Sequence, residues 1–142
     1  MKEMTTEATR LHPDWAQLQD KRESTVMLPA LWAVDGLTFL AGLYLAISPW
    51  VVGFNGLSTL SANNLIVGVA LAMLALRFNS AGRRAIGVDW VVPVIGGWTI
   101  IAPWVASGYV ATTASVWNNV VTGIIAVLIG LAAMSLRMAR AT

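Results

Sequence analysis

Four long apolar stretches separated by short polar segments dominate the pattern of the chain. They run approximately over residues 28–52, 60–78, 88–106 and 116–136. Each stretch is near the ~20 residues that a helix needs to cross the hydrocarbon core of a bilayer. In the first stretch, Trp32 and Trp50 are roughly 27 Å apart at about 1.5 Å per helical residue, close to a ~30 Å core. The pattern therefore predicts an all-α membrane protein with four transmembrane helices.

The first and third apolar stretches each reach a small residue followed by Pro and Trp. The two copies are Ser48-Pro49-Trp50 and Ala102-Pro103-Trp104. Proline removes a backbone donor and clashes with the carbonyl four residues back, so a helix bends or ends there. Tryptophan, which is apolar but carries one N–H group, suits the boundary between hydrocarbon and water. We expect both Pro-Trp steps to mark where a helix leaves the membrane.

A polar segment precedes the first apolar stretch. In it, Pro13 is expected to open a short amphipathic helix with Leu11, Trp15 and Leu18 on one face. This helix could rest on the protein or the membrane interface, or dock on a partner. Disorder of the segment is the remaining alternative. The predicted division is an N-terminal segment 1–27, a first repeat 28–78, a basic loop 79–87, a second repeat 88–138 and a tail 139–142.

The positive charges predict the orientation of the spans. All nine Lys and Arg residues lie in the N-terminal segment, in the loop 77–84 or in the C-terminal tail. The loops 53–62 and 107–115 carry no charge. Because basic residues favour the cytoplasmic side, two helical hairpins with both termini in the cytoplasm are expected.

The composition excludes several classes of function. Hydrophobic residues make up 57% of the chain and charged residues 11%, against about 25% charged residues in typical globular chains. The chain has no Cys and a single histidine, His12, which excludes thiol chemistry and a histidine metal cluster. The basic residues form no stripe, so a nucleic-acid partner is not expected. Ser48 has no His or Cys to activate it as a nucleophile, and we expect neither an enzyme nor a cofactor.

The two halves of the chain repeat each other. At an offset of 54 residues, Asp35 aligns with Asp89, Gly42 with Gly96, and Pro49-Trp50 with Pro103-Trp104. After a one-residue insertion in the outer loop, Asn63-Asn64 align with Asn118-Asn119 and Gly68 with Gly123. Each unit contains an even number of spans, so the copies are predicted to have the same orientation, as parallel repeats.

These paired motifs resemble the SPW-repeat family of small bacterial membrane proteins. Asp89-Trp90 and Trp117-Asn118 are also similar to that family's pattern, and the resemblance covers about residues 30–138. The chain departs from the pattern at Ala102, so no chemistry can depend on a serine in both copies. The resemblance implies a multi-pass protein of the bacterial plasma membrane. It implies no established reaction.

Two carboxylates near the predicted cytoplasmic interface are the first candidate site residues. Asp35 lies within the first apolar stretch and Asp89 at the entry of the third. An ionised carboxylate inside a span is costly and suggests a function, but helix capping or a salt bridge also explains one near the interface. We expect one ion pair per hairpin, Asp35 with Arg77 and Asp89 with Arg137. A proton or ion path is the alternative.

Two asparagine pairs are the second set of candidates. Asn63-Asn64 and Asn118-Asn119 open the second and fourth apolar stretches. Asparagine is a strong helix N-cap, so capping is the simplest interpretation. Together with Ser48 and the Trp indoles, these amides could instead line a polar pocket for a small polar ligand, a lipid headgroup or a quinone.

The sequence favours a non-enzymatic function in the bilayer. The pairs Gly68/Ala72 and Ala126/Gly130 have the spacing that lets membrane helices approach closely. A scaffold or accessory subunit that binds other membrane proteins, or itself, is the leading hypothesis. A small transporter or channel component and a lipid- or quinone-binding protein are the alternatives.

Overall fold

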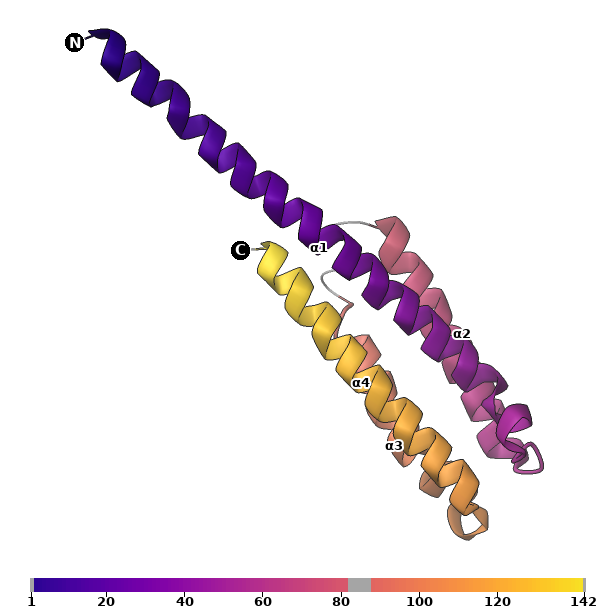
Figure 1. The fold of residues 1–142 in the computed structure, drawn as a ribbon. Helices are drawn as coiled ribbons and strands as arrows, with labels where there is room; N and C mark the ends of the chain where they lie inside the picture. The colour runs from indigo at the N-terminus through magenta and orange to yellow at the C-terminus, as the bar shows by residue number, and fades with distance from the viewer. Residues whose placement is uncertain (1, 82–87, 142) are drawn as a thin grey trace.

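The computed structural model describes residues 2–81 and 88–141, and within these ranges the protein is helical (Figure 1). Arg83 and Arg84 of the predicted basic loop lie outside the described residues. The elements are α1 (Lys2–Val52), α2 (Ser58–Ala81), α3 (Val91–Ser107), the short 3₁₀ helix η2 (Gly108–Val110) and α4 (Thr113–Ala141).

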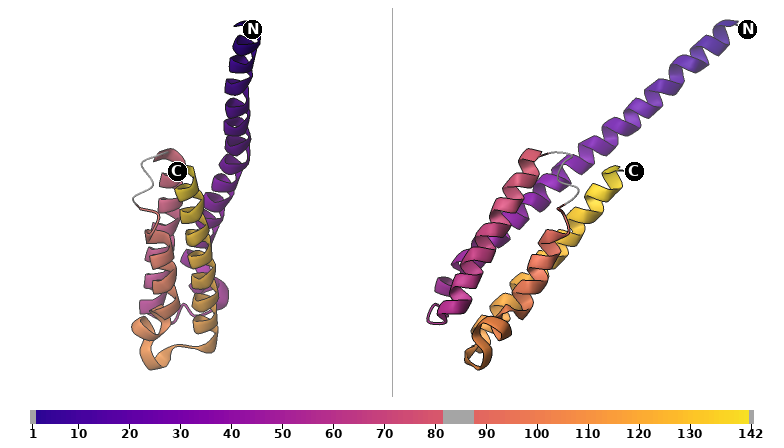
Figure 2. Two further views of the ribbon diagram at one scale, coloured as in Figure 1. Left: turned by 90° about the vertical axis from the view of Figure 1, so that its left-hand side faces the viewer. Right: turned by 180° about the vertical axis from the view of Figure 1, so that it is seen from behind.

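The helices form a bundle of two closely packed pairs. α1 packs mainly on α2, and α3 mainly on α4, while α1–α4 and α2–α3 contacts join the two pairs. The short connections after α1 and α3 lie together at one end of the bundle (Figure 2). The C-terminus and the long N-terminal part of α1 lie at the other end.

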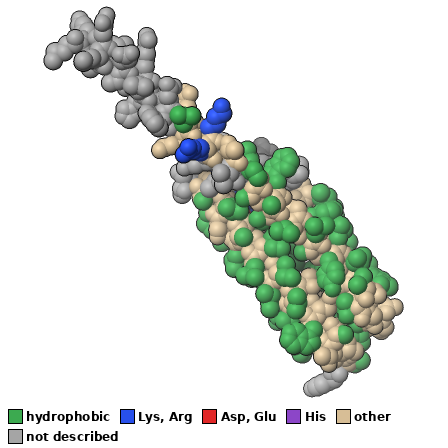
Figure 3. Space-filling model, in the orientation of Figure 1, with side chains coloured by type: hydrophobic (Ala, Val, Ile, Leu, Met, Phe, Trp, Pro, Cys, Tyr) green, Lys and Arg blue, Asp and Glu red, His purple; other side chains and the backbone are tan. Residues whose placement is uncertain are grey.

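The bundle has apolar side chains outside and polar side chains inside. Ile66 is 68% exposed and Leu128 is 62% exposed, whereas Asn64 and Asn119 are completely buried. Hydrophobic side chains cover the visible face of the bundle from end to end (Figure 3). This arrangement suits hydrocarbon as the solvent, because a lipid-facing surface is apolar and polar groups find partners inside.

Three helices are long and apolar enough to cross a membrane. They are the segments Leu28–Val52 of α1, Ser58–Arg77 of α2 and Thr113–Arg140 of α4. α3 is also apolar but has 17 residues, fewer than the ~20 of a typical span.

α1 is much longer than the short N-terminal helix that the sequence predicted. It continues without a break from Lys2 through Pro13 to Val52, so the polar segment and the first apolar stretch are one helix of 51 residues. Residues 14–27 contain no Gly or Pro, and eight of the fourteen are good helix formers (Ala, Gln, Leu, Lys, Arg, Glu or Met), so no turn separates the two parts. Among the described side chains of this extension, Ala16–Arg22 are exposed.

Glycines hold the members of each helix pair in close contact. A Cβ atom on Gly42 would lie 2.7 Å from the carbonyl oxygen of Gly68, across α1 and α2. A Cβ atom on Gly96 would lie 2.8 Å from the carbonyl oxygen of Gly123, across α3 and α4. Both distances are too short for a real side chain, so backbone meets backbone at equivalent places in the two pairs.

Each helix ends within one turn after its Pro-Trp step, close to where the sequence predicted the end of the span. α1 continues past Pro49 to Val52, and Pro103 lies inside α3. The helices end where the backbone turns to positive φ, at Gly53 (φ 86°) and Gly108 (φ 54°). Glycine adopts this conformation without steric cost, so it stops a helix more effectively here than the proline before it.

Candidate functional site: two polar clusters inside the bundle

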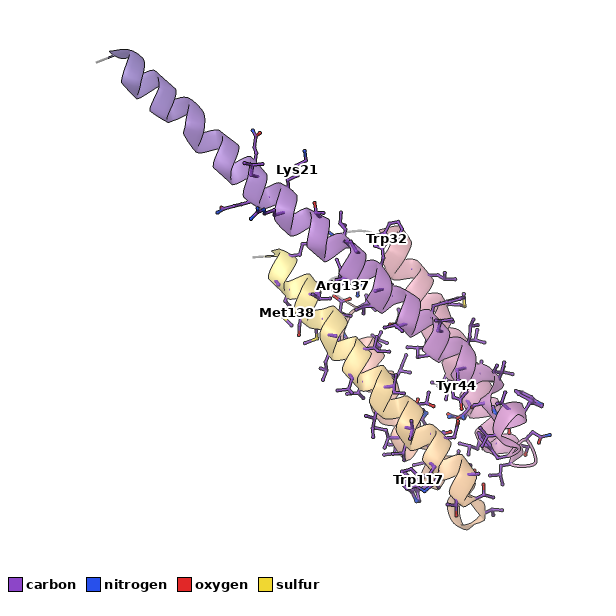
Figure 4. All side chains as sticks on the ribbon, in the orientation of Figure 1. Lys21, Trp32, Tyr44, Trp117, Arg137 and Met138 are labelled. Carbon is purple, nitrogen blue, oxygen red and sulfur yellow. The ribbon has the colours of Figure 1, made fainter. Side chains whose placement is uncertain are left out.

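One arginine holds two aspartates at the end of the bundle from which α1 extends. Arg137 of α4 donates from Nη2 to Asp35 Oδ1 of α1 at 2.5 Å, and from Nη1 to Asp89 Oδ1 at 2.6 Å. Figure 4 shows Arg137 between α4 and α1. The exposed fraction of the side chain is 9% for Arg137, 11% for Asp35 and 5% for Asp89. We call these three residues the Asp–Arg triad.

The pairing differs in part from the expected one. The contact between Asp89 and Arg137 is the predicted one, but Asp35 is paired with the same arginine, whereas the sequence suggested Arg77. The planar guanidinium has several N–H donors in a fixed fork, so it can serve two carboxylates at once. The triad thereby ties α1, α4 and the turn before α3 together.

Asp89 does not cap α3, which was one of the roles considered for it. The N-cap residue of α3 is Trp90, whose side chain makes no capping hydrogen bond. The carboxylate of Asp89 instead points to Arg137. A buried guanidinium attracts a carboxylate more strongly than the partial charge of a helix end does.

A second cluster lies towards the opposite end of the bundle, where Asn64 and Asn119 pair across the two helix pairs. Asn64 Nδ2 donates to Asn119 Oδ1 at 2.8 Å, and Asn119 Nδ2 donates to Asn64 Oδ1 at 3.0 Å. Asn118 Nδ2 donates to Asn119 Oδ1 at 3.2 Å, and Asn63 Nδ2 to Asn64 Oδ1 at 3.4 Å. We call these four residues the asparagine network.

Two aromatic side chains extend the network to the bundle surface. Tyr44 Oη donates to Asn118 Oδ1 at 2.8 Å, and Trp98 Nε1 donates to Asn63 Oδ1 at 3.0 Å. Tyr44 aligns with Trp98 at the offset of 54 residues. Each aromatic donor thus reaches the asparagine of the other repeat, and the two contacts are equivalent.

Ser48 connects the network to the first proline. Its hydroxyl donates to the carbonyl oxygen of Leu45 at 2.8 Å and accepts from Asn64 Nδ2 at 3.3 Å. Leu45 is the residue whose carbonyl would bond the N–H group that Pro49 lacks. The serine therefore satisfies the backbone acceptor that the proline frees. Ala102 cannot do this in the second copy.

The asparagines do not cap their helices, so this prediction is wrong. α2 begins at Ser58 and α4 at Thr113, which places both asparagine pairs more than one turn inside the helices. The N-terminus of α4 is capped instead by Thr112 and Ser115. Thr112 Oγ1 accepts from the Ser115 N–H at 3.2 Å, and the Ser115 hydroxyl accepts from the Thr112 N–H at 3.0 Å.

The tryptophans occupy the two ends and the surface of the bundle. Trp32 lies at the end near the Asp–Arg triad and Trp117 near the opposite end (Figure 4). Trp98 is partly exposed and hydrogen-bonded to Asn63. Among the tryptophans whose side chains the structure describes, those exposed by more than half are Trp32, Trp50, Trp90, Trp104 and Trp117.

An apolar layer lies in the core between helices of both pairs. Leu71, Val92 and Ala126 are buried there and contact one another. Among the described residues, no group of three or more His, Asp or Glu side chains is close enough to hold a metal ion. The geometry supports interhelical connection by the two polar clusters, because their members bond to each other.

The alignment of the repeats contained a signal for the asparagine network that we did not use. Tyr44 and Trp98 are equivalent aromatic donors, and equivalent asparagines follow each of them in the next helix. A donor repeated in this way suggests a repeated acceptor. The mutual pairing of Asn64 and Asn119 has no such signal, since it depends on how the two repeats face each other.

A comparison with known families identifies the family of the chain. The family model described as SPW repeat domain matches residues 31–133, most of the chain, and the chain therefore belongs to this family. No curated protein and no solved structure matches it. With its long apolar helices, the chain is a multi-pass membrane protein.

Proposed function

We propose that this SPW repeat protein is a non-enzymatic scaffold or accessory subunit of a membrane complex. It crosses the bacterial plasma membrane four times as two helical hairpins, with both termini in the cytoplasm. α3 alone is shorter than a typical span, so residues 91–110, which comprise α3 and η2, together form the third span. The distribution of Lys and Arg supports the orientation.

The N-terminal extension of α1 is the observation that carries this proposal. It continues the first span as one unbroken helix and projects beyond the ends of α2 and α4 (Figures 1 and 2). At about 1.5 Å per residue, the part before residue 28 is roughly 39 Å long. Such a helix presents a surface far from the membrane, which suits a partner protein better than a small ligand.

The small-residue faces are not available for a partner, in contrast to what the sequence suggested. Gly68 and Ala72 contact Gly42 across α1 and α2. Gly130 contacts Pro93, and Ala126 is buried in the core. These faces already pack within the bundle, so the partner is expected on the extension.

Purification from the native host in mild detergent tests the proposal. We expect a protein partner in stoichiometric amount with the full-length chain and its loss when residues 2–20 are deleted. Leu18→Lys should weaken the complex, because Leu18 is an exposed apolar side chain on the extension. Gln19→Lys, at the next exposed residue, is the matched control. Absence of a partner, or its retention on the deleted form, would overturn the proposal.

The two alternatives receive less support. A transporter or channel needs polar groups near mid-membrane, but Leu71, Val92 and Ala126 fill the core between the helix pairs. A lipid or quinone at the Pro-Trp end would need free polar groups there. The residues considered for such a pocket, Ser48 and the asparagine network, bond instead to one another. Among the described residues, the buried hydroxyl of Ser107 has no hydrogen-bond partner, and one hydroxyl is little for such a ligand.

A further inference from the structure

A surface cleft of about 160 Å³ opens between α1 and α2 beside the Asp–Arg triad. Its wall is mostly apolar, and its one acidic group is the carboxylate of Asp35. The cleft therefore joins a lipid-facing surface to a buried charge. The lining residues are Trp32, Asp35, Gly36, Phe39, Ala75 and Leu76.

The charge balance of the triad favours a cation in this cleft. Two carboxylates share one guanidinium, so the three ionised groups carry a net negative charge. Asp35 is the more exposed of the two aspartates, with 11% of its side chain accessible against 5% for Asp89. A positive group in the cleft would face this excess charge in a medium that screens it weakly.

The lining of the cleft is not repeated in the second half of the sequence. At the offset of 54 residues, Gly36 aligns with Trp90 and Phe39 with Pro93. A Cβ atom added at Gly36 would meet no atom within 4 Å, so the glycine leaves this space open. The equivalent position in the second repeat carries an indole. This difference between the two repeats fits a site that binds one ligand per chain.

The lining defines the chemistry of the ligand. A carboxylate accepts hydrogen bonds, so the polar end of the ligand must donate them, whereas the carbonyls of a quinone can only accept. The aromatic rings of Trp32 and Phe39 also favour a cation over a neutral group.

The depth of the cleft matches the headgroup region of a bilayer. Trp32 is 68% exposed, as expected for an interfacial anchor. Asp35 is one helical turn further into the span, roughly 4.5 Å at about 1.5 Å per residue. We propose that the cleft binds an aminophospholipid, with its primary ammonium on Asp35 and its hydrocarbon along Phe39 and Leu76. This site is independent of the proposed scaffold function.

The test is a competition between lipids in one bilayer. The full chain is reconstituted with equal amounts of phosphatidylethanolamine, phosphatidylcholine and phosphatidylglycerol carrying the same acyl chains. Native mass spectrometry then counts the lipids that stay bound after transfer to detergent. We expect phosphatidylethanolamine to be retained about tenfold over each of the others, as a single charge-assisted contact allows.

Variants in which a larger side chain fills the cleft test the proposal most directly. Gly36→Leu should abolish the preference without unfolding, because a side chain there meets open space. Leu76→Trp, at an exposed lining position, should do the same from α2. Gly97→Leu is the matched control, since Gly97 is equally open and lies in α3. Equal retention of the three lipids by the parent, or an unchanged preference in both filled variants, would overturn the proposal.

Discussion

Asn64 and Asn119 face each other in the core and exchange two amide hydrogen bonds, at 2.8 and 3.0 Å. They are equivalent residues of the two repeats, so the contact joins the repeats through a pair of like side chains. Both are completely buried. In hydrocarbon, an amide without a partner is costly, which makes this pair a connection that depends on both members.

We expect Asn64→Ala to destabilise the protein by about 1–3 kcal/mol, because it leaves the amide of Asn119 buried with fewer partners. Asn119→Ala should cost a similar amount. The double variant should cost about 1 kcal/mol less than the sum of the two, since neither member of the pair is left buried without the other. Unfolding of all four proteins in one detergent, followed by circular dichroism, measures the difference. Additive losses would show that the pair is not coupled.

The shared arginine predicts an order of effects in the Asp–Arg triad. Arg137→Gln should cost about 3–5 kcal/mol, because it leaves two buried carboxylates without their cation. Asp35→Asn should cost much less, since Arg137 keeps Asp89 as a partner and the excess negative charge is removed. Arg77→Gln is the control that leaves the triad intact. A larger loss for Arg77→Gln than for Arg137→Gln would support one ion pair per hairpin instead.

The repeat explains why the sequence predicted part of this site and not the rest. Asp35 and Asp89 align, and so do the asparagine pairs, which made these residues visible as candidates. Arg137 has no counterpart, since Gly82 aligns with it in the first repeat. An arginine that occurs once cannot be assigned to one of two equivalent carboxylates by spacing. Only the three-dimensional packing of the two repeats shows that Arg137 pairs with both Asp35 and Asp89.

The ends of the helices were harder to predict than the apolar spans. The apolar stretches correctly located α1, α2 and α4, because hydrophobic length is a strong signal. The Pro-Trp steps located the ends of α1 and α3 to within one turn. α1 continues through Pro49 to Val52 because the hydroxyl of Ser48 satisfies the carbonyl that the proline frees. The polar N-terminal residues were predicted to form a separate short helix. They belong to α1 instead, because their helix propensity lets α1 extend far beyond its apolar part.

Two adjacent glycines of α3 provide a matched test of close helix packing. A Cβ atom on Gly96 would lie 2.7 Å from the backbone nitrogen of Val127, whereas one on Gly97 would meet nothing within 4 Å. Gly96→Ala should therefore destabilise by about 1–3 kcal/mol through overpacking. Gly97→Ala should be neutral or stabilise by about 0.5–1 kcal/mol, because glycine is a poor helix former. Equal unfolding midpoints for the two variants would argue against the close contact of α3 and α4.

Ser48 and Ala102 test how the protein accommodates its two prolines. Ser48→Ala should cost about 1 kcal/mol, because the Leu45 carbonyl loses its donor and Asn64 loses an acceptor. Ala102→Ser places the same hydroxyl before Pro103, where Ala102 is completely buried. We expect no comparable gain there, since the added oxygen must fit into a filled core. Unfolding midpoints of the two single variants check this asymmetry, and an unchanged midpoint for Ser48→Ala would contradict the role of the hydroxyl.

The proposed four-span topology can be tested directly, because the chain has no cysteine of its own. Single cysteines are introduced by Gly56→Cys after α1, Ala114→Cys at the start of α4 and Arg140→Cys at its end. All three positions are exposed. With four spans and both termini in the cytoplasm, a membrane-impermeant maleimide should label the first two in intact cells. It should label the third only after permeabilisation.

Labelling at position 114 tests whether α3, which is shorter than a typical span, crosses the membrane. If α3 does not cross the membrane, the cysteines at 56 and 114 will lie on opposite sides. Only one of them will then react in intact cells. Labelling of both from outside, together with protection of position 140, requires that the 17 residues of α3 and the turn that follows cross the bilayer.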